Sequence, residues 1–235
     1  MKKNDKVALL GSGINQGGFS EIEELFKNRS IPYEILSHHN QINKSHSLAI
    51  SLGYQRIIPK NQLDQLPLGL VVLHSSDLPQ GRGWAPHFYT IYNKRKSLTL
   101  TMLYADEGVD SGDIIAKARY PIDELSTINE LRKIDDALTL FLLEKFLGKI
   151  TASKIKGKSQ DLLEIEPTYH KKRVPEDSKV FEDMDPEKLR HFLRCLPPEH
   201  PGYTEKSGKK VYFPSNSERD FKVITQNITL EDLSS

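Results

Sequence analysis

Apolar residues in the first third of the chain come in short runs separated by glycine-rich or amphipathic stretches. The runs at residues 7–10, 33–36 and 70–73 predict strands, and the stretches that begin at Ser20 and span 45–52 predict helices. Strands that alternate with helices are typical of a parallel sheet. The expected fold class is therefore α/β, with a Rossmann-like, open, twisted and mainly parallel sheet flanked by helices.

The pattern changes character in the middle of the chain. Residues 97–103 alternate polar and apolar side chains, as a half-buried strand does, and residues 113–122 form a second extended run after a turn. Between residues 127 and 147 the apolar positions recur at close to helical spacing. This spacing predicts one long amphipathic helix.

The C-terminal third of the chain is polar and interrupted by prolines. A short helix is expected at residues 186–193, and strand-like pieces are expected at 211–213 and 221–224. We therefore divide the chain into a core domain, residues 1–157, and a C-terminal extension, residues 158–235, which consists of a short helix and a β-hairpin.

Charge and cysteine content narrow the classes of function. Lys and Arg number 33 against 32 Asp and Glu, for a net charge of +1, which argues against a protein that coats nucleic acid or an acidic membrane. Cys195 is the single cysteine, so neither an intrachain disulfide nor a cysteine-based zinc cluster can form. The apolar run at residues 7–10 is too short for a signal peptide or a membrane span. The cytoplasm is the expected location.

A glycine loop follows the first predicted strand. Gly11 and Gly13 precede a helix, and amide groups at a helix N-terminus bind anions, so a phosphate can lie there. The third glycine, Gly17, comes one residue later than the dinucleotide-binding fingerprint requires. An ordinary tight turn is the simpler explanation of these residues taken alone.

Three other positions have the chemistry of a ligand site. His74 follows the apolar run 70–73, and a side chain at the carboxyl end of a parallel strand faces the crevice where such sheets bind ligands; a structural histidine is the alternative. Arg82 lies between glycines beside Trp84 and suits a phosphate or carboxylate, or else belongs to a surface loop over a buried tryptophan. Residues 106–113 are rich in carboxylates but lack the closing glutamate of an EF-hand. A general acid or base is the better functional interpretation.

These motifs resemble the signature of the folate-dependent formyltransferases. The similarity covers about residues 5–150 and keeps the order and spacing of the family's motifs. It is carried by residues 58–60 (IPK), residues 74–79 (HSSDLP), Arg82-Gly83, Pro86 and residues 109–115 (VDSGDII).

The resemblance implies N10-formyltetrahydrofolate as co-substrate, no metal, and a catalytic pair formed by His74 and Asp110. The family has an asparagine two residues before the histidine, where this chain has Val72. Loss of one such hydrogen-bond donor costs roughly 10²–10³ in rate, so either Ser75, Ser76 or a backbone amide replaces it, or the site is weak. The residues that the resemblance assigns to folate are Ile57, Ile58, Asp106, Glu107, Gly108 and Val109.

The acceptor amine is where members of the family differ. Residues 167–178 resemble the segment that follows the catalytic core in nucleotide-sugar formyltransferases. Residues 167–235 carry 12 Lys or Arg against 12 Asp or Glu, without the positive excess expected for tRNA binding. The resemblance implies a nucleotide-linked amino sugar, UDP more than dTDP, such as the UDP-4-amino-4,6-dideoxy sugar of the pseudaminic acid pathway. The residues expected to bind it are Gly11, Gly13, Arg82, Trp84, Tyr169, Lys172 and Arg173.

Two other functions remain open at this point. A deformylase would pass the formyl group to water, and a sugar-nucleotide binding protein would have lost activity at Val72. Lys172 and Arg173 also fit a solvated basic run. The C-terminal hairpin is a candidate contact for a homodimer.

Overall fold

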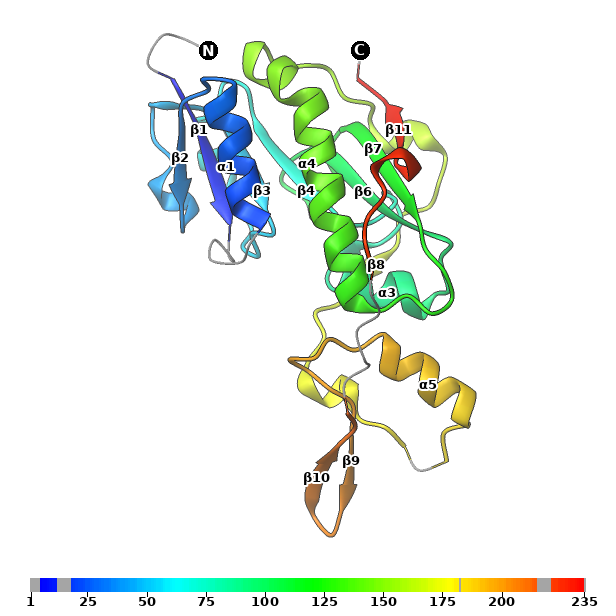
Figure 1. Cartoon of the computed structure of the whole chain (residues 1–235). Coiled ribbons are helices and arrows are strands. Elements are labelled where there is room, and N and C mark those ends of the chain that lie inside the picture. The colour runs from blue at the N-terminus through cyan, green and yellow to red at the C-terminus, as the bar shows by residue number, and fades with distance from the viewer. Residues whose placement is uncertain (1–4, 12–17, 182, 215–220, 235) are drawn as a thin grey trace.

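The structure is a computed structural model that describes residues 5–11, 18–181, 183–214 and 221–234 (Figure 1). Within these ranges, seven strands form one sheet in the order β11-β7-β6-β4-β3-β1-β2. The pairs among β2, β1, β3 and β4 are parallel, and those from β4 through β6 and β7 to β11 are antiparallel. Five of the seven strands therefore point the same way, and the expected mainly parallel α/β sheet flanked by helices is confirmed.

The elements have the following bounds. The sheet contains β1 (Lys6–Gly11), β2 (Tyr33–Leu36), β3 (His46–Leu52), β4 (Leu70–His74), β6 (Ser97–Tyr104), β7 (Ile114–Pro121) and β11 (Thr229–Asp232). The helices are α1 (Gly18–Asn28), α2 (Lys60–Leu63), α3 (Pro86–Tyr92), α4 (Ile128–Ala152) and α5 (Pro186–Arg194). Two separate pairs are formed by β5 (Arg82–Gly83) with β8 (Tyr169–His170), and by β9 (Tyr203–Lys206) with β10 (Lys209–Tyr212).

The helix expected at residues 45–52 is wrong, because this segment forms β3. It pairs with β1 on one side and β4 on the other, and six of its seven residues are buried. When both faces of a strand are buried, its residues do not alternate between apolar and polar. The sequence pattern then cannot distinguish the strand from a buried helix. Tertiary pairing therefore decides the conformation of this segment.

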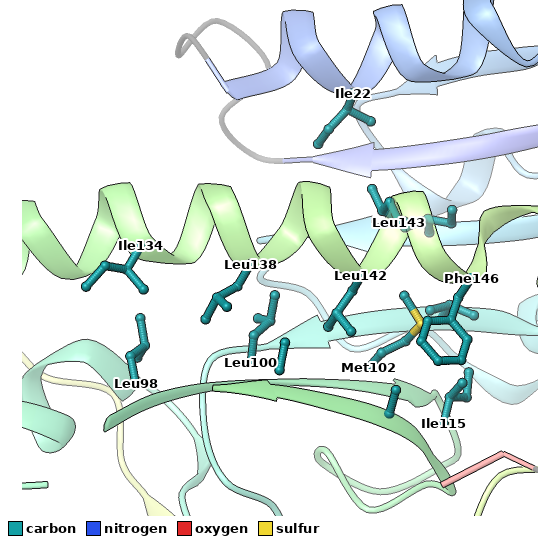
Figure 2. Packing of buried hydrophobic residues seen from close by; sticks show 14 of the residues in the cluster. Ile22, Leu98, Leu100, Met102, Ile115, Ile134, Leu138, Leu142, Leu143 and Phe146 are labelled. Carbon is teal, nitrogen blue, oxygen red and sulfur yellow. The ribbon is translucent and has the colours of Figure 1, made fainter. Parts of the chain in front are cut away.

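The main core lies between α4 and the sheet, with α1 beside α4 on the same face (Figure 1). A capping box begins α4, since the Thr127 hydroxyl accepts from the Glu130 N–H while the Glu130 carboxylate accepts from the Thr127 N–H. Burial of each large apolar side chain contributes about 1.5–3 kcal/mol. Figure 2 shows Ile134, Leu138, Leu142 and Phe146 of α4 over Leu98, Leu100 and Met102 of β6 and Ile115 of β7.

The C-terminal extension contains the expected helix, α5, and the expected hairpin, β9–β10, which project from one end of the sheet (Figure 1). Residues 221–224 form no strand; instead the chain returns to the sheet as β11, antiparallel to β7. The boundary at residue 157 stays a prediction. In the part of the chain described, no helix combines the length and the apolar character needed to span a bilayer.

Candidate active site

Alternate residues of β4 face opposite sides of the sheet, and one side carries the candidate site. Val71 and Leu73 pack into the core under α4. Leu70, Val72 and His74 therefore face the other side. Leu70 lines a pocket of about 280 Å³ there, and His74 lies four residues further along, about 13 Å at 3.3 Å per residue. The pocket is lined by Lys60, Leu63, Asp64, Leu66, Gly69, Leu70, Ala105, Asp106, Glu107 and Lys154.

His74 and Asp110 come together at the end of β4, as the sequence predicts for the catalytic pair. Nδ1 of the buried His74 ring is 3.6 Å from Oδ2 of Asp110. Nε2 of His74 lies 2.9 Å from the carbonyl oxygen of Gly81; a carbonyl only accepts, so this nitrogen carries the proton. The same Oδ2 of Asp110 accepts from the Gly83 N–H at 2.8 Å. One loop, residues 81–83, thus holds both members of the pair.

The loop that carries Asp110 is fixed by its backbone. Asp110 has a φ of +51°, a left-handed conformation that aspartate tolerates better than most residues. A Cβ on Gly112 would lie 2.0 Å from the carbonyl oxygen of Tyr104, so only glycine fits there. The side-chain amide of Gln160 donates to the carbonyl oxygens of Asp110 and Gly112, both at 2.9 Å. These contacts fix the direction of the Asp110 carboxylate.

Gln160 also connects this loop to Arg82. Its Oε1 accepts from Nε and Nη2 of Arg82 at 3.1 and 2.7 Å. Nη1 of Arg82 donates to the Tyr169 hydroxyl at 2.6 Å. Arg82 is 7% exposed, and its guanidinium is held by neutral partners. Sequence reasoning missed Gln160, because its partners lie 48 to 78 residues away and no motif surrounds it.

The C-terminal extension reaches the site through the short β5–β8 pair. Gly83 faces His170 there, with a φ of +93° and room for no Cβ, which would lie 2.5 Å from the His170 carbonyl oxygen. Tyr169 is 59% exposed. Nζ of Lys172 lies 4.6 Å from the centre of the Trp84 ring, a cation–π contact. Arg82, Trp84, Tyr169 and Lys172 therefore gather beside the candidate site.

Arg173 differs from these four predicted sugar-binding residues. Its guanidinium carbon lies 3.6 Å from the centre of the Phe88 ring in α3, and Nη2 donates to the Asp177 carbonyl oxygen. Burial lowers the pKa of Arg173. The structure places this side chain between α3 and the extension. Of the predicted phosphate loop, Gly11 ends β1, and Gly13 lies outside the described residues.

Two of the six residues expected to bind folate, Asp106 and Glu107, line the pocket on the His74 side of the sheet. Ile58 packs against the apolar cluster that contains Leu70, while Ile57 is 75% exposed. Residues 106–109 are exposed. Glu107 forms an ion pair with Lys60 from α2, and both residues line the pocket.

The hydroxyl of Ser75, one of the donors expected in place of the family asparagine, donates to Asp135 of α4 at 2.6 Å. Val72 lies half-buried on the pocket side of β4, between Leu70 and His74. Among the residues described, no group of three or more His, Cys, Asp or Glu side chains is arranged to hold a metal ion.

The fold and the site together describe an α/β protein with a histidine–aspartate pair at the end of a central strand. Residues 21–137 match the formyl transferase family. This region of the chain, 117 of the 235 residues, is thus similar to that family.

Individual proteins carry the similarity further along the chain. A methionyl-tRNA formyltransferase of Kosmotoga olearia is 33% identical over 162 residues, 69% of this chain and 51% of that protein; the chain thus spans about half the length of this relative. A sugar N-formyltransferase from Shewanella has a similar structure, with a TM-score of 0.76, 18% identity, and coverage of 92% of this chain and 98% of that chain. HypX from Aquifex aeolicus in complex with tetrahydrofolic acid gives a TM-score of 0.72 at 17% identity, over 89% of this chain and 37% of that one.

Proposed function

We propose that the protein transfers the formyl group of N10-formyltetrahydrofolate to the amine of a nucleotide-linked sugar. The observation that carries the proposal is the His74–Asp110 pair on the face of β4 that also carries the pocket. The family match over residues 21–137 and the tetrahydrofolate complex of a structural relative support formyl-folate as the co-substrate.

The residues of the pair suit this chemistry. When the amine attacks the formyl carbon, the carbonyl oxygen becomes an oxyanion, and a protonated His74 can donate to it. Asp110 lies where its carboxylate balances the positive charge of the ring. The Gly83 N–H holds Asp110 without neutralising its charge. For His74 to reach the substrate through Nε2, its contact with the Gly81 carbonyl must break.

The residues beside the pair support a sugar nucleotide as the acceptor. Tyr169 presents an exposed ring on which a base can stack, and Lys172 supplies a positive charge beside Trp84. UDP stays the expected nucleotide, and a pseudaminic-pathway amino sugar the expected acceptor. Methionyl-tRNA is the competing acceptor, because the methionyl-tRNA formyltransferase relative is 33% identical.

A mass-spectrometric assay tests the proposal. The protein is incubated with N10-formyltetrahydrofolate and, separately, UDP-linked amino sugars, dTDP-linked amino sugars and methionyl-tRNA. We expect one amino sugar to gain the mass of one formyl group, and we expect His74→Ala to abolish that gain. Formylation of methionyl-tRNA alone would reject the sugar acceptor. Formate release in the absence of any amine would instead indicate a deformylase.

A further inference from the structure

A second histidine lies beside the candidate active site and comes from the C-terminal extension. His170 is the last residue of β8 and faces Gly83 of β5. A Cβ built on Gly81 would lie 3.9 Å from Cδ2 of His170, and the carbonyl oxygen of the same glycine contacts His74. His74 and His170 therefore flank one residue of the loop, although 96 positions separate them in the sequence.

Stacking holds the His170 ring and leaves its nitrogens available. The ring lies on Tyr89 of α3, with centroids 3.6 Å apart and planes 7° from parallel. Neither ring nitrogen of His170 has a hydrogen-bond partner within the described part of the chain, whereas Nε2 of His74 contacts a carbonyl oxygen. An imidazole in a fixed position with free nitrogens is suited to exchange a proton with a ligand.

The surroundings favour the neutral form of this ring. Burial lowers the pKa of His170, and the positive charges of Arg95 and His74 lower it further. The groups that face the ring are Tyr89 in α3, Arg95 after α3, and His74 in β4. A neutral imidazole accepts protons, so at neutral pH His170 is in the form that a general base requires.

We propose that His170 is the general base that takes a proton from the acceptor amine before this amine attacks the formyl carbon. The inference rests on the formyl transfer proposed above. The ammonium group of the acceptor gives one proton to His170, and the freed electron pair forms the bond to the formyl carbon. The bond from this carbon to N10 of the folate then breaks, and N10 takes a second proton of the amine by way of His74. His170 releases its own proton to water, so one proton is released per turnover.

The test compares the pH dependence of two variants. His170→Phe keeps an aromatic ring to stack on Tyr89 but cannot accept a proton; His200→Phe makes the same change at an exposed histidine of the extension. The value of kcat/KM for the acceptor amine is measured from pH 6 to 9 with saturating formyl-folate. General-base catalysis is worth about 10²–10⁴-fold, so we expect His170→Phe to lose about 100-fold at pH 7. Its loss should shrink as rising pH deprotonates the free amine, while His200→Phe follows the wild type.

Each of the following outcomes would overturn the inference. A loss in His170→Phe that is the same at every pH would mean that the ring has a structural role only. Failure of added imidazole to restore activity to folded His170→Ala would exclude proton transfer at this position. If the wild type binds formyl-folate but formylates no amine, the proposed function fails, and the role of His170 fails with it. If the wild type is active and His170→Phe has the same pH profile, the role of His170 alone is rejected.

Discussion

Near the end of β4, the two faces of the central sheet are closed by different kinds of contact, although an apolar cluster around Leu70 covers another part of the second face. On the α4 face, apolar side chains such as Leu138 and Leu142 pack against β6 and β7. On the opposite face, near the end of β4, the chain is held by hydrogen bonds from residues distant in sequence, with Gln160 connecting Arg82 to the Asp110 loop. Apolar packing has little directional preference, whereas each hydrogen bond fixes an angle.

This difference indicates that one set of contacts mainly stabilises the fold and the other mainly positions the catalytic side chains. The apolar face contributes free energy of folding that depends on volume and burial. The polar face contributes little net stability per contact, about 1 kcal/mol for a typical hydrogen bond, but it determines where the His74 ring and the Asp110 carboxylate lie. Substitutions on the first face should therefore change stability, and substitutions on the second should change rate.

The largest effect is expected from Asp110→Asn. The amide oxygen can still accept from the Gly83 N–H, but the negative charge beside His74 is lost. We expect the kcat of formyl transfer to fall by about 10³, or about 4 kcal/mol in activation free energy. The free energy of unfolding in urea should change by less than about 1 kcal/mol. Asp113→Asn, at an exposed carboxylate of the same loop, is the control and should retain activity.

Leu138→Ala in α4 is expected to lower stability and leave the rate unchanged. Leu138 is fully buried, and removal of such a side chain leaves a cavity that destabilises a protein by about 3 kcal/mol. Urea unfolding should show this loss, while kcat per folded molecule stays near that of the wild type. A fall in kcat larger than the unfolded fraction explains would mean that the two faces are coupled.

Gln160 tests the contact between the loop and Arg82. Gln160→Leu keeps the volume but leaves Arg82 and two carbonyl oxygens without their partner, at an expected cost of about 2 kcal/mol in stability and tenfold in kcat. Gln160→Glu separates the two halves of the contact, because a carboxylate accepts from Arg82 but cannot donate to the carbonyls of Asp110 and Gly112. If the loop matters for rate, Gln160→Glu should be more stable than Gln160→Leu and equally slow.

Local signals in the sequence predict part of this arrangement. The apolar runs of β1, β2 and β4, the alternation of β6 and the helical spacing of α4 each depend on neighbouring residues, and the structure confirms the type of each element. The half-buried character expected of β6 is wrong, because the strand is buried along nearly its whole length. The position of His74 at the end of β4 follows from the same signal. The resemblance to the formyltransferases, not the local pattern, predicted Asp110 as its partner.

Other features depend on contacts that no local pattern records. Strand β3 is buried along nearly its whole length, so its pairing with β1 and β4 determines its conformation. Strand β11 pairs with β7 with Thr229 opposite Arg119. An ion pair also joins Arg119 to Glu231, which lies 112 positions later in the sequence. Gln160 and His170 also depend on distant contacts, because each residue takes its place in the site by contacting the loop at residues 81–83, about 80 residues earlier. Cys195 shows the opposite case: burial raises its pKa to about 12, in agreement with the packed, unreactive role expected for a lone buried thiol.

The smallest effect is expected at Val72, and it would show whether the site lacks a hydrogen-bond donor for the oxyanion. Val72 lies on the pocket side of β4 two residues before His74, and Ser75 is already bonded to Asp135. Val72→Asn adds a donor of similar volume at this half-buried position. We expect kcat to rise about tenfold, because an extra donor to the oxyanion stabilises the transition state, at about 1 kcal/mol of stability. Val72→Asp, of the same size but unable to donate when ionised, is the control. Equal rates for Val72→Asn and the wild type would mean that another donor, such as a backbone amide of residues 81–83, already contacts the oxyanion.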